Sequence, residues 1–243
     1  MPQRLFDRQS RLLEYLTSDA AIFGGEDDGP LDPSLRGIDR TMLRLEARFS
    51  CEKRIEKIAG TLPKTFAALG ESRSTIIREF VAACPPVDIG RLENAVQFHD
   101  FLVSRARDAT GPPYLPDIVR CELACAERGS AVPALPSKSR NRRNKARRGH
   151  VRRKPDMTLL RCDHDVRPVF EAAAPIVPKQ RRTLLAVTIE ATSKAPRVCE
   201  IPPAVFDLLS ALDDWTDLRV DCTSETDGLV SELLAQGLIE VAG

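Results

Sequence analysis

Apolar residues recur at helical spacing through the first half of the chain. They repeat every three or four residues, which is the pattern of an amphipathic helix. The ranges with this pattern are 5–16, 33–59, 61–69, 74–83, 88–106 and 115–128. Pairs of Gly and Pro separate several of them, and β-branched alternation is nearly absent. We therefore predict an all-α helical domain of five or six helices over residues 1–129.

The pattern changes after residue 156. Residues 183–189 are rich in β-branched side chains and residues 197–201 alternate between charged and apolar side chains, which favours strands. Two further short strands are expected at 157–161 and 238–241. Helices are expected from 204 to about 215 and from 226 to 236. This order is typical of a small winged-helix-like α+β domain over residues 156–243, so the predicted fold class is α+β.

A charged segment separates the two predicted domains. The whole chain has a net charge of +1, but residues 138–154 hold ten basic residues and no acidic one, so the remainder carries −9. Such a segment repels itself and lacks apolar anchors. We predict a basic, Pro- and Ser-containing linker over residues 130–155. Binding of an acidic protein surface or of nucleic acid by this linker stays as an alternative.

Length and composition narrow the class of protein. The 243 residues are 42% hydrophobic and 29% charged, which suits a soluble globular chain of one or two domains. No apolar run approaches 18 residues and the first ten residues include several charges, so we expect neither a membrane span nor a signal peptide. The seven cysteines are expected as reduced thiols in a cytoplasmic protein.

The sequence contains no evident catalytic constellation. His99 is a lone histidine in a helix, and Cys121 and Cys125 lie four residues apart without a second pair to complete a metal site. We expect small buried side chains at both cysteines. The prediction is therefore no catalytic residue, no metal ligand and no cofactor in this chain. An enzyme in its own right stays as an alternative, because distant residues can converge in a fold.

A winged-helix domain can serve two different uses. DNA reading needs basic or amide side chains on the last long helix, but residues 226–236 contain no Arg or Lys and include Asp227 and Glu232. Peptide capture needs only an open strand edge beside a helix, to which an extended peptide adds a strand. We therefore favour peptide recognition, with a winged-helix DNA-binding regulator as the alternative.

Several stretches carry a resemblance to a known family. Residues 199–212, CEIPPAVFDLLSAL, and 227–240, DGLVSELLAQGLIE, resemble the leader-recognition element of ribosomal-peptide modification systems. Residues 112–124, PPYLPDIVRCELA, and 162–171, CDHDVRPVFE, are similar to segments of the partner proteins of multinuclear non-haem iron-dependent oxidases. The similarity is greatest to the partner proteins of methanobactin biosynthesis. It does not extend to the basic linker.

The resemblance implies a non-catalytic partner subunit. Such proteins form a heterodimer with the iron oxidase, bind the leader of a precursor peptide and present its core cysteines for oxidative modification. In methanobactin systems this yields oxazolone–thioamide groups, and the product binds copper. The iron belongs to the partner enzyme.

Candidate sites follow from these expectations. A leader is expected to add to the edge strand 197–201, against the helix 226–236. The peptide-binding set is Arg197, Val198, Cys199, Glu200, Ile201, Val230, Leu233 and Leu234. Docking of the partner enzyme is expected at Arg167, Val169, Phe170, Tyr114 and Asp117. The guanidinium of Arg167 can bind bidentately to a carboxylate of the partner or of its own domain. An internal contact between the two domains is the alternative to docking for residues 162–171.

Overall fold

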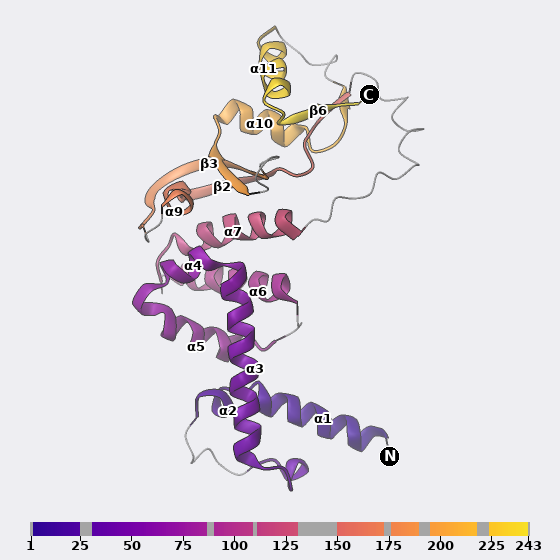
Figure 1. The fold of residues 1–243 in the computed structure, drawn as a ribbon, viewed down its shortest axis with the longest axis vertical. Coiled ribbons are helices and arrows are strands. Elements are labelled where there is room, and N and C mark those ends of the chain that lie inside the picture. Colours follow the sequence, from indigo (N-terminus) through magenta and orange to yellow (C-terminus); the bar gives the residue numbers. More distant parts are fainter. Residues whose placement is uncertain are drawn as a thin grey trace. The chain divides into compact units, whose positions relative to one another are not determined.

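The structure is a computed structural model that describes residues 2–24, 31–86, 90–108, 111–130, 150–172, 176–189, 195–217 and 224–242. Contacts divide the chain into two compact units, Met1–Val119 (unit 1) and Arg120–Gly243 (unit 2). Unit 1 contains helices, and unit 2 combines helices with small antiparallel sheets (Figure 1). The protein is therefore a mixed α+β chain, as predicted. None of the described helices is both long and apolar enough to span a bilayer.

Unit 1 is built from a succession of helices. They are α1 (Pro2–Leu16), α2 (Asp19–Phe23), a 3₁₀ turn (Pro33–Leu35), α3 (Arg40–Thr61), α4 (Pro63–Ala68), a second 3₁₀ turn (Gly70–Ser72), α5 (Arg73–Ala83), α6 (Arg91–Arg107) and the start of α7 (Leu115–Ser130). The predicted range 33–59 differs, because α3 begins only at Arg40. The Asp39 side chain accepts hydrogen bonds from the N–H groups of Thr41 and Met42 and caps the helix there.

Phenylalanine rings form the core of unit 1. Phe98 of α6 is fully buried, and its ring centroid lies 5.5 Å from that of Phe66 and 5.0 Å from that of Phe80. Phe101, one helical turn further along α6, contacts the Phe80 ring at 5.5 Å. Edge-to-face contacts of this kind add to the burial of apolar area. The cluster thereby packs α4, α5 and α6 together.

The strands that the structure describes in unit 2 form two three-stranded antiparallel sheets. Its elements are β1 (His150–Arg153), β2 (Thr158–Asp165), α9 (Arg167–Glu171), β3 (Lys179–Ile189), β4 (Pro196–Glu200), α10 (Pro203–Ala211), β5 (Thr216–Asp217), α11 (Ser224–Ala235) and β6 (Ile239–Val241). The strand orders are β5–β1–β6 and β2–β3–β4. The strands β2, β3, β4 and β6 overlap the four predicted ones, but β2 extends to Asp165 and β3 begins already at Lys179. β1, α9 and β5 were not predicted.

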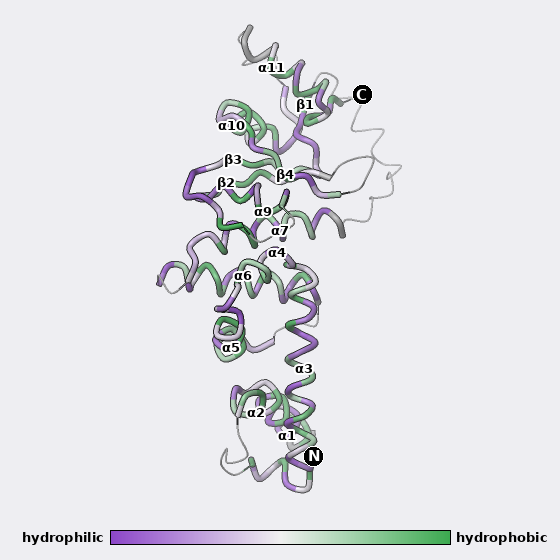
Figure 2. Tube along the Cα trace, turned by 60° about the vertical axis from the view of Figure 1, so that its left-hand side comes forward, coloured by the Kyte–Doolittle hydropathy of each residue, from purple (hydrophilic) through white to green (hydrophobic). Residues whose placement is uncertain are grey.

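Helices cover both faces of the sheet β2–β3–β4. On one face the C-terminal part of α7 lies against β2, where Arg120 donates to the carbonyl of Arg161 at 2.9 Å and Arg128 to the Thr158 hydroxyl at 3.1 Å. On the other face lies α10 (Figure 1). There a buried cluster joins the sheet to α10, α11 and β6, and it includes Ala186, Ile201, Phe206, Leu209, Leu212, Leu233 and Ile239. Figure 2 shows the apolar colouring of α10 that this packing requires.

The boundary between the units differs from the predicted one. The helical domain was expected to end at residue 129, but the contacts divide the chain after Val119, inside α7. The reason is that the C-terminal half of α7 packs on the sheet of unit 2. The predicted linker 130–155 also contains β1, whose Val151 is buried and whose Arg152 pairs with Glu240. Residues 131–149, with most of the basic segment, lie outside the described residues.

Candidate functional site

β4 is an edge strand of the sheet β2–β3–β4. It pairs with β3 in an uninterrupted antiparallel register from Leu185 opposite Glu200 to Ile189 opposite Pro196. In the part of the chain that the structure describes, no strand pairs with the other edge of β4. Pro202 and Pro203 follow it and begin α10. The predicted edge strand at 197–201 is thus present, shifted by one residue.

The hydrogen-bond pattern determines which main-chain groups of β4 face outward. The N–H of Ile201 donates to the carbonyl of Leu184 at 2.9 Å, one pair beyond the end of the register. Hydrogen-bonded and non-hydrogen-bonded pairs alternate in an antiparallel ladder. The main-chain groups of Cys199 therefore point toward β3, and those of Val198 and Glu200 point toward the open edge. An added strand would pair with these two residues.

A cleft of about 480 Å³ follows this open edge. It is lined by Arg167, Phe170 and Glu171 of α9 and by residues 196–200, which are the whole of β4. Successive side chains of a strand point to opposite faces of the sheet. Because all five residues of β4 line the cleft, it runs along the main-chain edge and not over one face. The cleft therefore has the position that strand addition requires.

The helix beside this edge is α9 and not α11, which corrects the predicted flank of the site. α9 contacts β4 directly. On α11, Leu233 is buried in the cluster with α10 and β6, Val230 packs against that cluster, and Leu234 is partly exposed. Ile201 belongs to the same buried cluster. None of these four residues lines the cleft. Leu233, Val230 and Ile201 pack in the core of unit 2, and Leu234 is exposed on α11.

Four charged side chains tie α9 to the sheet. Arg167 donates from Nε and Nη2 to the two carboxylate oxygens of Asp165 at 2.9 and 2.8 Å, and its Nη2 lies 2.8 Å from Glu200 Oε2. Arg181 of β3 donates to Glu200 Oε1 at 2.9 Å and also pairs with Asp165. Each carboxylate thus contacts both guanidinium groups. This network of two carboxylates and two guanidinium groups holds α9 in place relative to β3 and β4, and so positions the walls of the cleft.

The electrostatics of this network keep Asp165, Arg167 and Arg181 charged at neutral pH. Hydrogen bonds from Arg167 and then from Arg181 hold the pKa of Asp165 well below its ordinary value. The same carboxylates raise the pKa of Arg167 and of Arg181. The bidentate bond expected of Arg167 therefore exists, and both of its carboxylates belong to unit 2.

Two further charged side chains of the cleft have no ion-pair partner among the described residues. They are Arg197 on β4, which is exposed, and Glu171 on α9. Beside them lie Phe170 and Val198, which are half-buried. The cleft can therefore offer a cation, an anion and an apolar surface to a peptide, as well as main-chain groups.

The predicted partner-docking residues do not share one environment. Val169 is buried in α9, whereas Phe170 and Arg167 line the cleft. Tyr114 and Asp117 belong to unit 1, and the Asp117 side chain is buried. The structure thus brings two predicted partner residues, Arg167 and Phe170, into the cleft with the predicted peptide residues of β4.

Three residues of the site were missed by the sequence reasoning: Asp165, Glu171 and Arg181. A signal for the first was present, since Asp165 stands two residues before Arg167 and the intervening turn leads into Pro168 at the start of α9. Arg181 gave no such signal. It lies in a run of four polar residues, 179–182, and reaches Asp165 only because β3 pairs with β2.

The described residues show no arrangement suited to metal binding. No group of three or more His, Cys, Asp or Glu residues among them could hold a metal ion. Cys121 is fully buried, and burial beside Glu122 raises the pKa of the Cys125 thiol to about 11, so it stays protonated at neutral pH. His164 is buried and its neighbour Asp163 is exposed on the other face of β2.

No protein-family model matches the chain, and a search of curated proteins found no matching sequence.

Proposed function

We propose that the chain is a non-catalytic partner subunit of a multinuclear non-haem iron oxidase and captures the leader of a precursor peptide as an added strand on β4. The oxidase, and not this chain, would hold the iron and modify the core cysteines. Oxazolone–thioamide formation, as in methanobactin biosynthesis, is the reaction that the sequence resemblance favours. The observation that carries the peptide role is the cleft along the outward edge of β4.

The cleft supports a specific pattern in the captured peptide. Val198 and Glu200 face the side of the sheet where α9 lies, since Glu200 contacts Arg167. Arg197 and Cys199 face the opposite side. An added strand alternates in the same way, so one row of its side chains would meet Phe170 and Val198 and the other would meet Arg197. We therefore expect apolar residues alternating with acidic ones in the bound segment.

A winged-helix-like arrangement is part of the proposal. The sheet β5–β1–β6 shares one buried cluster with α10 and α11, which supports it. The sequence of α11 carries no Arg or Lys, so it lacks the cations that a DNA-reading helix needs. Binding to duplex DNA that falls steeply with added salt would favour the alternative, a DNA-binding regulator.

The partner role is tested by mass in solution. The chain is co-expressed with a candidate multinuclear non-haem iron oxidase, and the purified product is measured by size exclusion with light scattering. We expect a 1:1 complex with iron in the other chain. A species of 26.9 kDa that separates from the oxidase would contradict the heterodimer.

The peptide role is tested by hydrogen exchange. The leader of the precursor that the oxidase modifies is titrated into the chain, and amide exchange is measured. We expect protection of the Val198 and Glu200 amides on binding, because only these N–H groups of β4 are open to a new strand. The Cys199 amide, bonded to β3, is the internal control and should change little. Binding without protection at Val198 and Glu200 would place the peptide elsewhere.

A further inference from the structure

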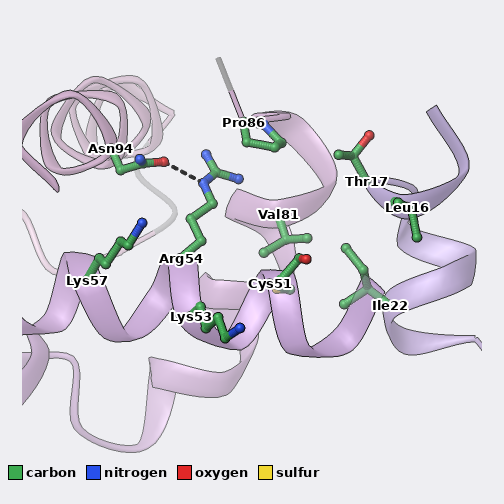
Figure 3. A pocket seen from close by; sticks show the side chains of 11 residues that line it. Leu16, Thr17, Ile22, Cys51, Lys53, Arg54, Lys57, Val81, Pro86 and Asn94 are labelled. Atoms are coloured by element: carbon green, nitrogen blue, oxygen red, sulfur yellow. Dashed lines mark hydrogen bonds between the residues drawn. The ribbon is translucent and has the colours of Figure 1, made fainter. Parts of the chain in front are cut away.

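Arg54 in unit 1 is a buried cation whose hydrogen bonds hold helices together. It lines a cavity of about 280 Å³ beside α3 (Figure 3). Its guanidinium donates to Asn94 Oδ1 at 2.8 Å, to the carbonyl of Cys84 at 2.8 Å and to Gln97 Oε1 at 2.6 Å. These bonds join α3 to α6 and to the end of α5. We assign this charge to the packing of unit 1.

The cleft along β4 presents charges of a different kind, because they are exposed to solvent. Arg197 of β4 and Glu171 of α9 are both exposed, and both line the cleft. An exposed side chain at the wall of a cleft can contact a molecule that enters it. The two charges therefore bear on which peptide the cleft accepts.

The strand register fixes the side of the sheet to which Arg197 points. Cys199 is directly opposite Ala186 of β3, and Ala186 belongs to the buried cluster that packs against α10. Directly opposite residues of an antiparallel pair share one face of the sheet, and so do residues two apart on one strand. Arg197 therefore projects from the face of the sheet on which α10 lies.

Glu171 approaches the cleft from the other side. The Nη2 atom of Arg167 lies 2.8 Å from Glu200 Oε2, so this side of α9 is turned toward β4. Glu171 follows Arg167 by four residues, and the N–H of Ala172 donates to the carbonyl of Pro168 at 2.9 Å, so the helix continues to this point. Side chains four residues apart lie on the same face of a helix. Glu171 is therefore turned toward the edge of β4 on the α9 side.

We propose that the captured segment carries an acidic side chain that meets Arg197 and a basic side chain that meets Glu171. The inference rests on the proposed capture of a peptide strand by β4. It adds that these two residues select the charge pattern of that strand, because a like charge at either position would be repelled. Phe170 and Val198 supply apolar contacts in the same cleft.

The positions of the two selected side chains in the peptide differ by an odd number. Arg197 and Glu171 act from opposite sides of the sheet, and successive side chains of an added strand alternate between those sides. Because β4 has five residues, the paired part of the peptide is equally long and the two side chains lie one or three positions apart.

Single charge reversals in the leader test this pattern without any change in the chain. The probe is the leader of the precursor that the oxidase modifies, labelled for fluorescence anisotropy, with each acidic residue changed to Lys and each basic residue to Glu in turn. We expect one acidic and one basic position, an odd number apart, at which reversal weakens binding about three- to tenfold. Weakening at positions an even number apart, or at no charged position, overturns the inference.

Reversals in the chain then assign each leader position to its partner. Arg197→Glu should weaken binding of the unchanged leader and restore it for the leader whose acidic residue has become Lys. Glu171→Lys should restore binding of the leader whose basic residue has become Glu. Arg182→Glu is the matched control, because Arg182 is exposed on β3 and does not line the cleft. Failure of either exchange to restore binding overturns the inference.

Two further measurements separate this result from that of the proposed function. Circular dichroism establishes that each variant is folded, and if one is not, the leader reversals decide. Amide exchange is measured for the unchanged chain with the unchanged leader. Protection at Val198 and Glu200 without the expected charge pattern overturns this inference alone, whereas lack of protection overturns strand capture and this inference with it.

Discussion

Replacing Val198 by proline tests strand addition at β4 most directly. The Val198 N–H faces the open edge, so the substitution removes a donor that an added strand needs and leaves every β3–β4 hydrogen bond in place. An edge strand tolerates proline where the N–H faces solvent. Each bonded pair of an antiparallel ladder exchanges two hydrogen bonds, and each contributes about 0.5–1.5 kcal/mol. Val198→Pro removes one of these two hydrogen bonds and leaves a carbonyl of the bound peptide without its donor, which predicts a loss of about 1–3 kcal/mol of binding free energy, or roughly 5- to 150-fold in affinity.

Cys199→Pro is the matched control for the position of the main-chain groups. The Cys199 N–H faces β3, where its register partner is Ala186, which is buried. Proline there leaves the Ala186 carbonyl without its donor, which costs about 1–3 kcal/mol of folding free energy. Val198→Pro loses only the packing of a half-buried valine, about 1 kcal/mol. Cys199→Pro is therefore expected to be the less stable variant, although the two positions are adjacent.

Two measurements separate these effects. Fluorescence anisotropy with a labelled leader peptide gives the affinity, and urea denaturation followed by circular dichroism gives the free energy of unfolding. The expected result for Val198→Pro is weak binding with a loss of only about 1 kcal/mol of folding free energy. If Val198→Pro binds the leader as the unchanged chain does, strand addition at this edge is refuted. If both variants lose the same stability, the outward direction of the Val198 N–H is wrong.

Three further substitutions test other parts of the structure. Asp165→Asn is expected to lower the free energy of unfolding by about 1–3 kcal/mol at pH 7, because it breaks the charged network. The pKa of Asp165 is depressed in the folded state, so the stabilisation that this carboxylate contributes is present above pH 3.8 and is lost as the pH falls further. The urea denaturation curves of the variant and of the unchanged chain should therefore converge in acid. Phe170→Asp should weaken leader binding, and a loss of oxidase binding with unchanged peptide affinity would assign Phe170 to partner docking instead. Phe98→Ala should cost about 3–5 kcal/mol in unit 1 through the cavity it leaves among the Phe66 and Phe80 rings, and a cost below 1 kcal/mol would contradict that packing.

Local sequence patterns predicted most helices and strands because those elements depend on periodicity. The alternation at 197–201 identified β4, and the β-branched run at 183–189 identified most of β3. β1 could not be predicted from its local sequence pattern. Its four residues, His-Val-Arg-Arg, lie in a basic segment that predicts a solvated chain. The strand forms by pairing with β5 and β6, which lie more than 60 residues further along the chain, and its arginines pair with Glu240 and Asp213.

The candidate site was predicted only in part, because its geometry also depends on contacts between residues that are far apart in the chain. Alternation places Val198 and Cys199 on opposite faces of a sheet, but only the register with β3 tells which N–H faces outward. α9 has five residues, too few for a helical pattern to be recognised. Its place beside β4 depends on contacts of Arg167 with Asp165 and Glu200, and the second of these lies 33 residues away in the chain.

The surroundings of β4 also favour the proposed peptide capture over self-association. An open strand edge tends to pair with another copy of the chain, and proteins prevent this with short strands, proline, charge or a covering element. β4 combines all four: it has five residues, starts with Pro196, carries Arg197 and Glu200, and is flanked by α9. Pairing of two copies of β4 would place the Arg197 side chains of both copies close together, or would press α9 of one copy against α9 of the other. A single extended peptide needs only the width of the cleft. An acidic residue opposite Arg197 would then turn the charge that repels another copy into one that favours the peptide.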